Sequence, residues 1–401
     1  MKILHTADWH WSEHKLDRCL RSADFIIERM RAIRPDVHVI AGDYWDKRQV
    51  LSSASAVLPA LDIMKTLASI SPVVIILGNY AHDVPGSLGI FNNLNTAYPI
   101  YVTERAESIL LYQGQHGKSD RFEYFPLPED SEVSAPEADA IIHLFPYPNK
   151  SQFLAKRNGL SIEETNQILC DEIRKIFLGF AAAGDGLRCP KIFVGHCNVL
   201  EAKLSSGQTL IGQDIMISKH DLALASADYY ALGHIHLNQG IEPHMWYSGS
   251  IYHHDFGETE AKYLNVVKIE NGRVEVTREE IPSRPLSLHE VIFDSGKNTI
   301  LDENTQTDWI DADLRIRIHL GQEQSGLLSD EEITRKYPGA ATYKLERIIT
   351  PEERIRSDGI SHARTLRERL VEWGKAIEKS IPDEVLEMSD EMETCLHNIE
   401  Q

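Results

Sequence analysis

The sequence predicts an α/β fold built on a mostly parallel sheet, and three observations carry this prediction. Apolar runs of strand length alternate with amphipathic segments of helix length over the first 80 residues. Five apolar runs along the chain lead directly into Asp, Asn or His. Short apolar runs bounded by glycine and polar residues are typical of buried strands. Because ligands collect at the carboxyl ends of the strands in open α/β sheets, we expect a functional site where these runs end.

The five runs share one design and cover residues 2–10, 37–43, 73–79, 192–196 and 231–236. Their ends carry groups that can bind metal ions, namely Asp8, His10, Asp43, Asn79, His196, His234 and His236. Each motif alone (Asp-x-His, Gly-Asp, His-x-His) is more often a turn or a core residue than a ligand. Together, the carboxylate, carboxamide and imidazole groups suit two divalent cations better than one structural zinc.

Helical patterns connect the first three runs. Apolar side chains repeat at helical spacing over residues 16–33 until Pro35 stops the pattern, and residues 54–70 predict a second helix. The order strand, helix, strand, helix, strand indicates parallel pairing with the helices outside.

The pattern changes after residue 98. Residues 108–112 and 140–145 are strand candidates between polar loops, and we expect antiparallel additions to the sheet there. A helix predicted over residues 162–180 leads into the fourth run. Near residue 270, Asn271-Gly272 stands between two alternating runs and predicts a hairpin.

The chemistry-bearing pattern ends near Pro282, where we place a domain boundary. A small α+β unit is expected next, with strands over 314–320 and 343–349 around a helix over 330–337. From Ser361 the sequence predicts a helix up to about residue 381, followed by an acidic, solvated tail. Its stripe of Leu366, Leu370, Trp373 and Ile377 either packs back on its own domain or binds a partner.

Composition limits the classes of function. The chain has 401 residues and a formal net charge of −20, which disfavours tight, autonomous binding to DNA unless bound cations change the local charge. No window has the roughly 18 apolar residues of a membrane span. The N-terminus lacks the pattern of a secretory signal, and the five cysteines form no C-x-x-C pair, so we expect a cytoplasmic protein with reduced thiols.

The order of the ligand motifs, each behind an apolar run, resembles the calcineurin-like metallophosphoesterase superfamily over residues 1–280. Within it, the chain is most similar to the SbcD-type DNA-repair nucleases. That similarity rests on residues 4–10 (LHTADWH), 145–148 (FPYP), 230–236 (YALGHIH), and 247–250 (YSGS) followed by 255–258 (DFGE).

The resemblance implies an αββα sandwich over residues 1–282, a small α+β capping domain over 283–350, and a helical segment over 351–401 that docks with an SMC-like ATPase subunit. It implies a cytoplasmic, metal-dependent DNA nuclease of DNA repair and recombination, with exonuclease and single-strand endonuclease activity. The family commonly forms homodimers through helices of the catalytic domain, but no stripe in this sequence identifies that surface.

The resemblance also assigns the ligands. Asp8, His10 and His236 would hold one cation, His196 and His234 the other, and Asp43 would bridge them. Mn²⁺ is the family's usual ion, with Mg²⁺ as the alternative, and the pair would activate a water molecule that attacks phosphorus.

One block departs from the family pattern. The family has Gly-Asn-His-Asp, whereas this chain has Gly78-Asn79-Tyr80-Ala81-His82-Asp83. If the left side aligns, Asn79 is a ligand and a bulge precedes His82. If the right side aligns, Ala81 occupies the ligand position and the second cation loses a ligand. We favour Asn79 as the ligand and His82 as the catalytic acid or transition-state donor, oriented by Asp83.

Two other functions fit less well. A stand-alone phosphatase or cyclic-nucleotide phosphodiesterase would not need the additional 120 residues that follow the catalytic domain. A non-catalytic scaffold would be expected to lose ligands, and this chain retains at least six. His253 and His254 follow the Ser-Gly-Ser motif near the expected cleft, and of two interpretations, contact with phosphate or a surface loop, we favour the surface loop.

Overall fold

The computed structural model contains two compact units, Met1–Leu286 and Ser287–Gln401. It describes residues 1–113, 119–126, 135–148, 162–206, 208, 215–294, 299–302, 308–321, 324, 329–350, 360 and 362–399. None of the helices that these residues form has the length and apolarity needed to cross a membrane.

The first unit is built on two large sheets. In spatial order, the first sheet contains β15 (Arg273–Ile281), β14 (Lys262–Glu270), β1 (Lys2–Thr6), β2 (Val37–Ile40), β3 (Val73–Ile76) and β4 (Ile100–Thr103). The second contains β12 (Gln239–Glu242), β13 (Met245–Tyr247), β11 (Tyr229–Gly233), β8 (Lys191–His196), β7 (Ala140–Phe145), β5 (Glu107–Gln113) and β6 (Ser119–Phe125). Two short strands, β9 (Asn198–Val199) and β10 (Met216–Ile217), pair separately.

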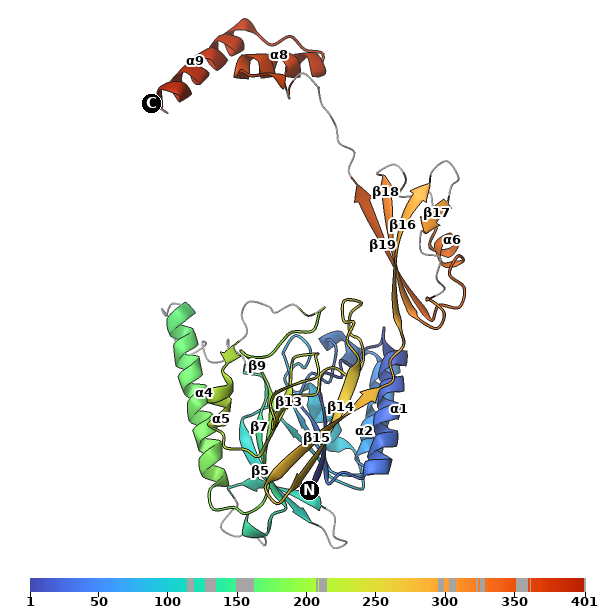
Figure 1. Cartoon of the computed structure of the whole chain (residues 1–401), viewed down its shortest axis with the longest axis vertical. Coiled ribbons are helices and arrows are strands. Elements are labelled where there is room, and N and C mark those ends of the chain that lie inside the picture. Colours follow the sequence, from blue (N-terminus) through green and yellow to red (C-terminus); the bar gives the residue numbers. More distant parts are fainter. Residues whose placement is uncertain are drawn as a thin grey trace. The chain divides into compact units, whose positions relative to one another are not determined.

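Helices cover the outer faces of both sheets (Figure 1). They are α1 (Leu16–Ile33) and α2 (Ala54–Leu67) on the first sheet, and α4 (Ile162–Gly184) and α5 (Lys219–Ala223) on the second. Short 3₁₀ turns occupy Arg48–Ser52, Ser87–Asn93 and Ala135–Glu137. Between the sheets, Val39 and Val74 from the first pack in one buried cluster with Ile142 and Val194 from the second. These four layers confirm the predicted αββα sandwich.

The five ligand-bearing runs are divided between the two sheets. Strands β1, β2 and β3 are parallel neighbours in the first sheet. Strands β8 and β11 are parallel neighbours in the second. Side chains at the carboxyl ends of both groups can therefore face each other across the sandwich.

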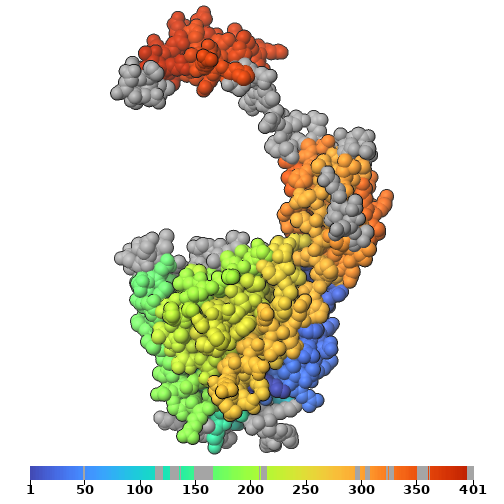
Figure 2. Space-filling view, viewed as in Figure 1, coloured from blue at the N-terminus to red at the C-terminus, as the bar shows by residue number. Residues whose placement is uncertain are grey.

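Most predicted elements are present with small shifts in their bounds. The helix predicted over 162–180 continues to Gly184, and the one predicted over 54–70 ends at Leu67. Residues 140–145, which form β7, were predicted to pair antiparallel. This is correct for the pairing with β5 and wrong for the pairing with β8, which is parallel. The predicted hairpin is formed by β14 and β15, and its edge strand β15 lies at the surface (Figure 2). Its turn residues Asn271 and Gly272 both have positive φ, 52° and 73°.

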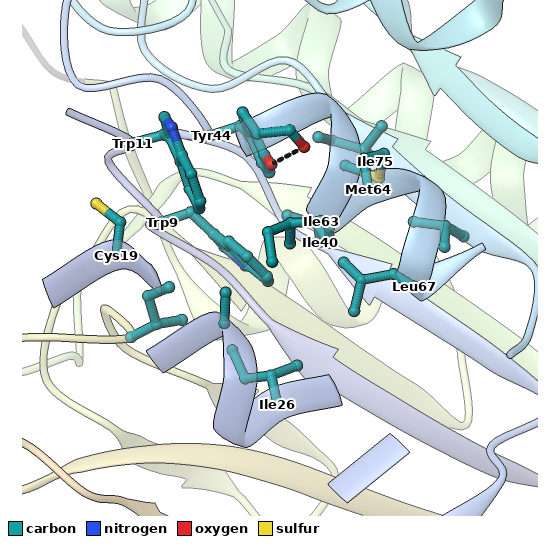
Figure 3. Packing of buried hydrophobic residues seen from close by; sticks show 14 of the residues in the cluster. Trp9, Trp11, Cys19, Ile26, Ile40, Tyr44, Ile63, Met64, Leu67 and Ile75 are labelled. Atoms are coloured by element: carbon teal, nitrogen blue, oxygen red, sulfur yellow. Dashed lines mark hydrogen bonds between the residues drawn. The ribbon is translucent and has the colours of Figure 1, made fainter. Parts of the chain in front are cut away.

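An aromatic cluster supports the loops that follow β1 and β2. Trp9 and Trp11 stand on either side of His10 in the sequence, and both are fully buried. Their rings stack on Tyr44 at centroid distances of 5.5 and 6.3 Å. Figure 3 shows Trp9 and Tyr44 packed toward Ile63 of α2. Since Tyr44 follows Asp43 directly, this packing fixes two ligand-bearing loops against each other.

The second unit contains a four-stranded sheet and several helices. Its strands, in spatial order, are β17 (Thr299–Asp302), β16 (Leu286–Asp294), β18 (Asp313–Gly321) and β19 (Thr342–Thr350). Helix α6 (Asp330–Thr334) is shorter than the predicted 330–337 and begins with a capping box between Ser329 and Glu332. Its Ile333 packs with Ile316 and Ile318 of the sheet.

The C-terminal region forms two helices rather than one helix and a tail. Helix α8 (Leu366–Ala376) starts at the capping box of Thr365 and Glu368, and Ser361, the predicted start, lies outside the described residues. The acidic run is solvated as predicted, with Asp383, Glu387 and Asp390 exposed, but it is not a tail, because Asp383–Ile399 forms helix α9, which contacts α8. The acidic residues of α9 alternate with apolar residues at helical spacing. The prediction gave more weight to the acidic charge than to this spacing and therefore missed the helix.

Candidate metal centre

Strained backbone conformations occur at the predicted ligands. Asp8, His10, Asp43 and His234 have φ values of 51°, 41°, 50° and 98°. Residues other than glycine rarely adopt positive φ, and such strain is concentrated at functional sites. Hydrogen bonds from His10 N to Asp43 O and from Asp8 N to the carbonyl of Gly42, both 3.0 Å, hold the loops after β1 and β2 together.

The glycines of the ligand motifs permit close contact between the loops. A Cβ on Gly42 would meet His196 Nδ1 at 2.3 Å, and one on Gly78 would meet the backbone N of Asp43 at 2.1 Å. A Cβ on Gly233 would meet the carbonyl oxygen of Ala41 at 1.9 Å. Glycine is therefore required where these loops meet, within the first sheet at Gly78 and between the two sheets at Gly42 and Gly233.

Asp8, His10 and His236 form the first ligand group. Each offers one ligand atom, and these atoms lie within 4.8 Å of one another. The Nε2 atoms of His10 and His236 are 2.9 Å apart. Because His236 Nδ1 lies 2.6 Å from the Glu258 carboxylate, Nδ1 is the donor and Nε2 keeps its lone pair for the site.

Asp43, His196 and His234 form the second ligand group, with ligand atoms again within 4.8 Å of one another. His196 Nδ1 donates to the carbonyl of Ala41 at 2.7 Å, which directs Nε2 toward Asp43. That Nε2 atom is buried, lies 3.3 Å from Asp43 Oδ2, and forms no hydrogen bond with the described residues. A buried ring nitrogen without a hydrogen-bond partner is suited to bind a metal ion.

Asp43 belongs to the second group and also approaches the first. Its Oδ2 is 4.0 Å from His10 Nε2 of the first group and 3.3 Å from His196 Nε2 of the second. Its Oδ1 accepts a hydrogen bond from Asn79 N at 2.5 Å. The structure thus brings the residue predicted as the bridge between both sets of imidazoles.

Burial and neighbouring charges shift the pKa values of these groups in different directions. Burial raises the pKa of Asp8. Burial also disfavours ionised Asp43, but the imidazoles of His196 and His82 outweigh it and hold the Asp43 pKa well below its ordinary value. Burial lowers the pKa of His196, whereas Asp43 outweighs burial and raises it to about 9. Since metal ligands must be deprotonated, a cation here would replace the proton on His196. The donor set fits divalent cations with mixed N and O preference.

Asn79 lies beside Asp43, although its side chain is turned away. Its Oδ1 accepts a hydrogen bond from Ala81 N at 2.9 Å, while its backbone N contacts Asp43. Ala81 is exposed. Of the two alignments, the one with Asn79 as the ligand needs a side-chain rotation, whereas Ala81 has no donor atom to offer.

His82 lies next to the first group, with its ring centroid 4.5 Å from that of His10. Its Nδ1 donates to the carbonyl of Asp46 at 2.5 Å, so this carbonyl orients the ring. Burial lowers the pKa of His82, but Asp43 and the hydrogen bond to Asp46 outweigh burial and raise it above its ordinary value.

Asp83 does not make the contact predicted for it. Its buried carboxylate accepts backbone N–H groups of Tyr44, Trp45 and Gly78 at 3.2, 2.9 and 2.9 Å. Burial and nearby Asp43 raise its pKa to about 7. Asp83 therefore ties the loop after β3 to the loop after β2, and the orienting contact for His82 comes from Asp46 instead.

Two residues near the site were not assigned to it from the sequence. Glu258 is buried and accepts from His236 Nδ1 and from Lys262 Nζ. His254 is not a remote surface residue, because its ring centroid lies 4.5 Å from that of His10 and 5.5 Å from that of His236. Burial and Lys15 lower the His254 pKa to about 2, so its ring is neutral. In the sequence, only the Ser-Gly-Ser and Asp-Phe-Gly-Glu motifs beside these residues indicated that this loop belongs near the site.

Comparisons with known proteins agree with this geometry. Residues 1–238 match the family model described as calcineurin-like phosphoesterase. The chain is similar to the SbcD component of the nuclease SbcCD from Staphylococcus saprophyticus, with 26% identity over 76% of this chain and 74% of the relative. The Escherichia coli protein of the same name is 25% identical over 69% and 66% of the two chains. That of Bacillus subtilis is 25% identical over 81% of each.

Proposed function

Because the chain belongs to the calcineurin-like phosphoesterase family and is a metal-dependent phosphodiesterase, we propose that it is a DNA nuclease that uses two divalent cations. One observation carries the proposal: two buried groups of three ligands adjoin each other, because Asp43 of the second group also lies 4.0 Å from His10 of the first. A carboxylate offers two oxygens, and paired cations about 3.5–4 Å apart are the usual arrangement for in-line displacement at phosphorus.

The first cation would be held by Asp8, His10 and His236, and the second by His196 and His234, with Asp43 shared. Asn79 would add a carbonyl oxygen to the second after its side chain rotates. Mn²⁺ suits imidazole, carboxylate and carboxamide together, and Mg²⁺ is the alternative. Bound at these groups, the cations would supply Lewis acidity toward phosphate oxygens and make a water molecule acidic enough to act as nucleophile.

The chain's own residues set the tautomers and supply a proton. Ala41 O and Glu258 accept from the Nδ1 atoms of His196 and His236, so both rings present Nε2 to the site. His82 is held through Nδ1, which leaves Nε2–H to protonate the leaving sugar oxygen. Its raised pKa suits an acid that works near neutral pH.

DNA as the substrate and an ATPase as the partner are supported by the relatives that carry the name of the SbcCD nuclease. In this proposal the chain is the nuclease component of a DNA repair or recombination complex, and residues 287–350 form its cap. Helices α8 and α9 dock with an SMC-like ATPase. Trp373 of α8 and Met388 and Met392 of α9 are 43%, 61% and 56% exposed, which suits a docking face.

The proposal is tested by comparing substrates in Mn²⁺ and in a metal chelator. Labelled single- and double-stranded DNA, bis(p-nitrophenyl) phosphate and p-nitrophenyl phosphate are incubated with the purified chain. We expect Mn²⁺-dependent cleavage of DNA and of the phosphodiester. Hydrolysis of the phosphomonoester with no cleavage of DNA would instead support a stand-alone phosphatase.

A further inference from the structure

The loop after β13 reaches the candidate metal centre. His254 lies in this loop, and its ring contacts those of His10 and His236 of the first ligand group. Its side chain remains 23% exposed, so the ring is accessible from solvent. The His254 ring thus lies between the proposed cation site and the solvent from which the substrate arrives.

Lys15 determines which nitrogen of His254 carries the proton. Lys15 Nζ lies 3.2 Å from His254 Nδ1 and donates to the His254 carbonyl at 2.8 Å. An ammonium group can only donate, so Nδ1 must be the acceptor and the proton of the neutral ring is on Nε2. The positive charge at Nδ1 also makes Nε2–H a stronger donor.

The Nε2–H group of His254 faces Asp46 at a distance too long for a strong hydrogen bond. The carboxylate Oδ1 of Asp46 lies 3.5 Å from His254 Nε2, longer than the roughly 2.7–3.2 Å of an ordinary N–H···O hydrogen bond. Asp46 Oδ1 itself forms no hydrogen bond with the described residues. His254 Nε2–H can therefore turn to an oxygen of a ligand without breaking a strong bond.

The loop that carries His254 is held rigidly. His254 N donates to Glu258 Oε2 at 3.1 Å, and Arg18 donates to the His253 carbonyl at 3.1 Å. The Arg18 guanidinium also lies over the Phe256 ring, 5.7 Å from its centroid. A donor fixed before the substrate binds costs no reorganisation during the reaction, which is the condition for effective stabilisation of developing charge.

We propose that His254 is a substrate-contacting residue whose Nε2–H donates to a non-bridging oxygen of the scissile phosphate, and that Lys15 is its positioning residue. His82 and His254 each lie 4.5 Å from the His10 ring, with 6.5 Å between their own centroids. They have different tasks, because His82 gives a proton to the leaving group, whereas Lys15 beside Nδ1 of His254 leaves its Nε2–H to donate a hydrogen bond to the developing charge. This inference rests on the proposed phosphodiester hydrolysis.

The kinetic test uses the full chain with Mn²⁺ and bis(p-nitrophenyl) phosphate. His254→Ala should lower kcat by about 10²–10³-fold, the usual effect of removing one such donor, and should raise the inhibition constant of inorganic phosphate. Mn²⁺ content by mass spectrometry should stay at that of the wild type. His254→Gln, which keeps an N–H donor, should recover part of the activity. His253→Gln is the matched control, because His253 Nε2 contacts the Glu260 carbonyl, and its rate should be unchanged.

The positioning role of Lys15 is tested by measuring which tautomer His254 adopts. ¹⁵N NMR of the imidazoles should show the Nε2–H tautomer of His254 in the wild type and a mixture of tautomers in Lys15→Met, with Lys15→Arg restoring the first. Unchanged kcat and phosphate inhibition in His254→Ala would overturn the proposal. So would loss of a cation in that variant, which would make His254 a ligand. Failure of the wild type to hydrolyse any phosphodiester would refute the proposed function instead.

Discussion

The buried carboxylate of Glu258 accepts a hydrogen bond from Nδ1 of His236 at 2.6 Å. Lys262 Nζ lies 2.5 Å from the other oxygen, so the negative charge is compensated without a solvent contact. A carboxylate behind a ligating imidazole fixes its tautomer and makes Nε2 a better donor to a metal. Glu258 would therefore support the proposed first cation through His236, although it does not belong to either ligand group.

Replacing this carboxylate should weaken metal binding without abolishing it. We expect Glu258→Gln to raise the Mn²⁺ concentration for half-maximal hydrolysis by about 10–100-fold, the usual cost of losing such support. A Mn²⁺ titration of activity measures it, at a temperature where circular dichroism shows the variant folded. Glu260→Gln is the control in the same loop, because Glu260 contacts Ser205 and Ser206 instead. An unchanged Mn²⁺ requirement in Glu258→Gln would contradict the supporting role.

A variant of His82 should separate acid catalysis from metal binding. His82→Ala removes a ring whose Nδ1 is held by the Asp46 carbonyl, and turnover should fall by about 10²–10⁴-fold. The content of bound Mn²⁺, measured by mass spectrometry after gel filtration, should remain at two ions. Loss of one ion would show that His82 is itself a ligand.

The sequence predicted the elements that local periodicity determines. The run before Asp8 and the hairpin turn at Asn271 could be located from spacing alone. The division of the five runs between two sheets could not, because it depends on pairing between distant strands, and it came only from the family resemblance. The acidic residues concealed helix α9, since charge was weighed above its apolar spacing.

The ligand residues were easier to predict than their supports. Asp43 and His196 follow apolar runs directly, so their positions at strand ends can be derived. His254 and Glu258 reach the site through a loop whose path no local pattern specifies. The contact of Asp83 with three backbone N–H groups is equally invisible in the sequence, because it depends on how the loop after β3 meets the loop after β2.

Buried histidines away from the metal centre should make stability depend on pH. His143 is fully buried against Ser108, and burial lowers its pKa from 6.5 to about 4. The unfolded chain takes up this proton near pH 6.5, whereas the folded chain does so only near pH 4. The stability it contributes is thus complete above pH 6.5 and is lost as pH falls toward 4, by about 3 kcal/mol at most.

Chemical denaturation between pH 7 and 4 measures this effect. His143→Gln should reduce the proton uptake linked to unfolding by about one proton in that range. His319→Gln is the matched control, because His319 is partly exposed beside Glu290. An identical pH dependence in the wild type and in His143→Gln would contradict the assignment.

The C-terminal helices should be dispensable for chemistry. Deletion of residues 360–401 should leave the melting temperature and the cleavage of short single strands unchanged, because α8 and α9 contribute no residue to either ligand group. Co-purification with the proposed ATPase partner should be lost. Trp373→Ser should weaken it in the full chain, whereas the exposed control Lys379→Ser should not. Unfolding or aggregation of the truncated chain would indicate that the stripe packs on its own domain.

Asp43 provides the most direct test of the two-cation account, because its carboxylate approaches imidazoles of both ligand groups, His10 and His196. The measurement is Mn²⁺-dependent cleavage of labelled single-stranded DNA by the wild type and by Asp43→Asn, with circular dichroism to confirm that both are folded. We predict cleavage by the wild type and none by Asp43→Asn. Near-normal cleavage by a folded Asp43→Asn variant would contradict the account.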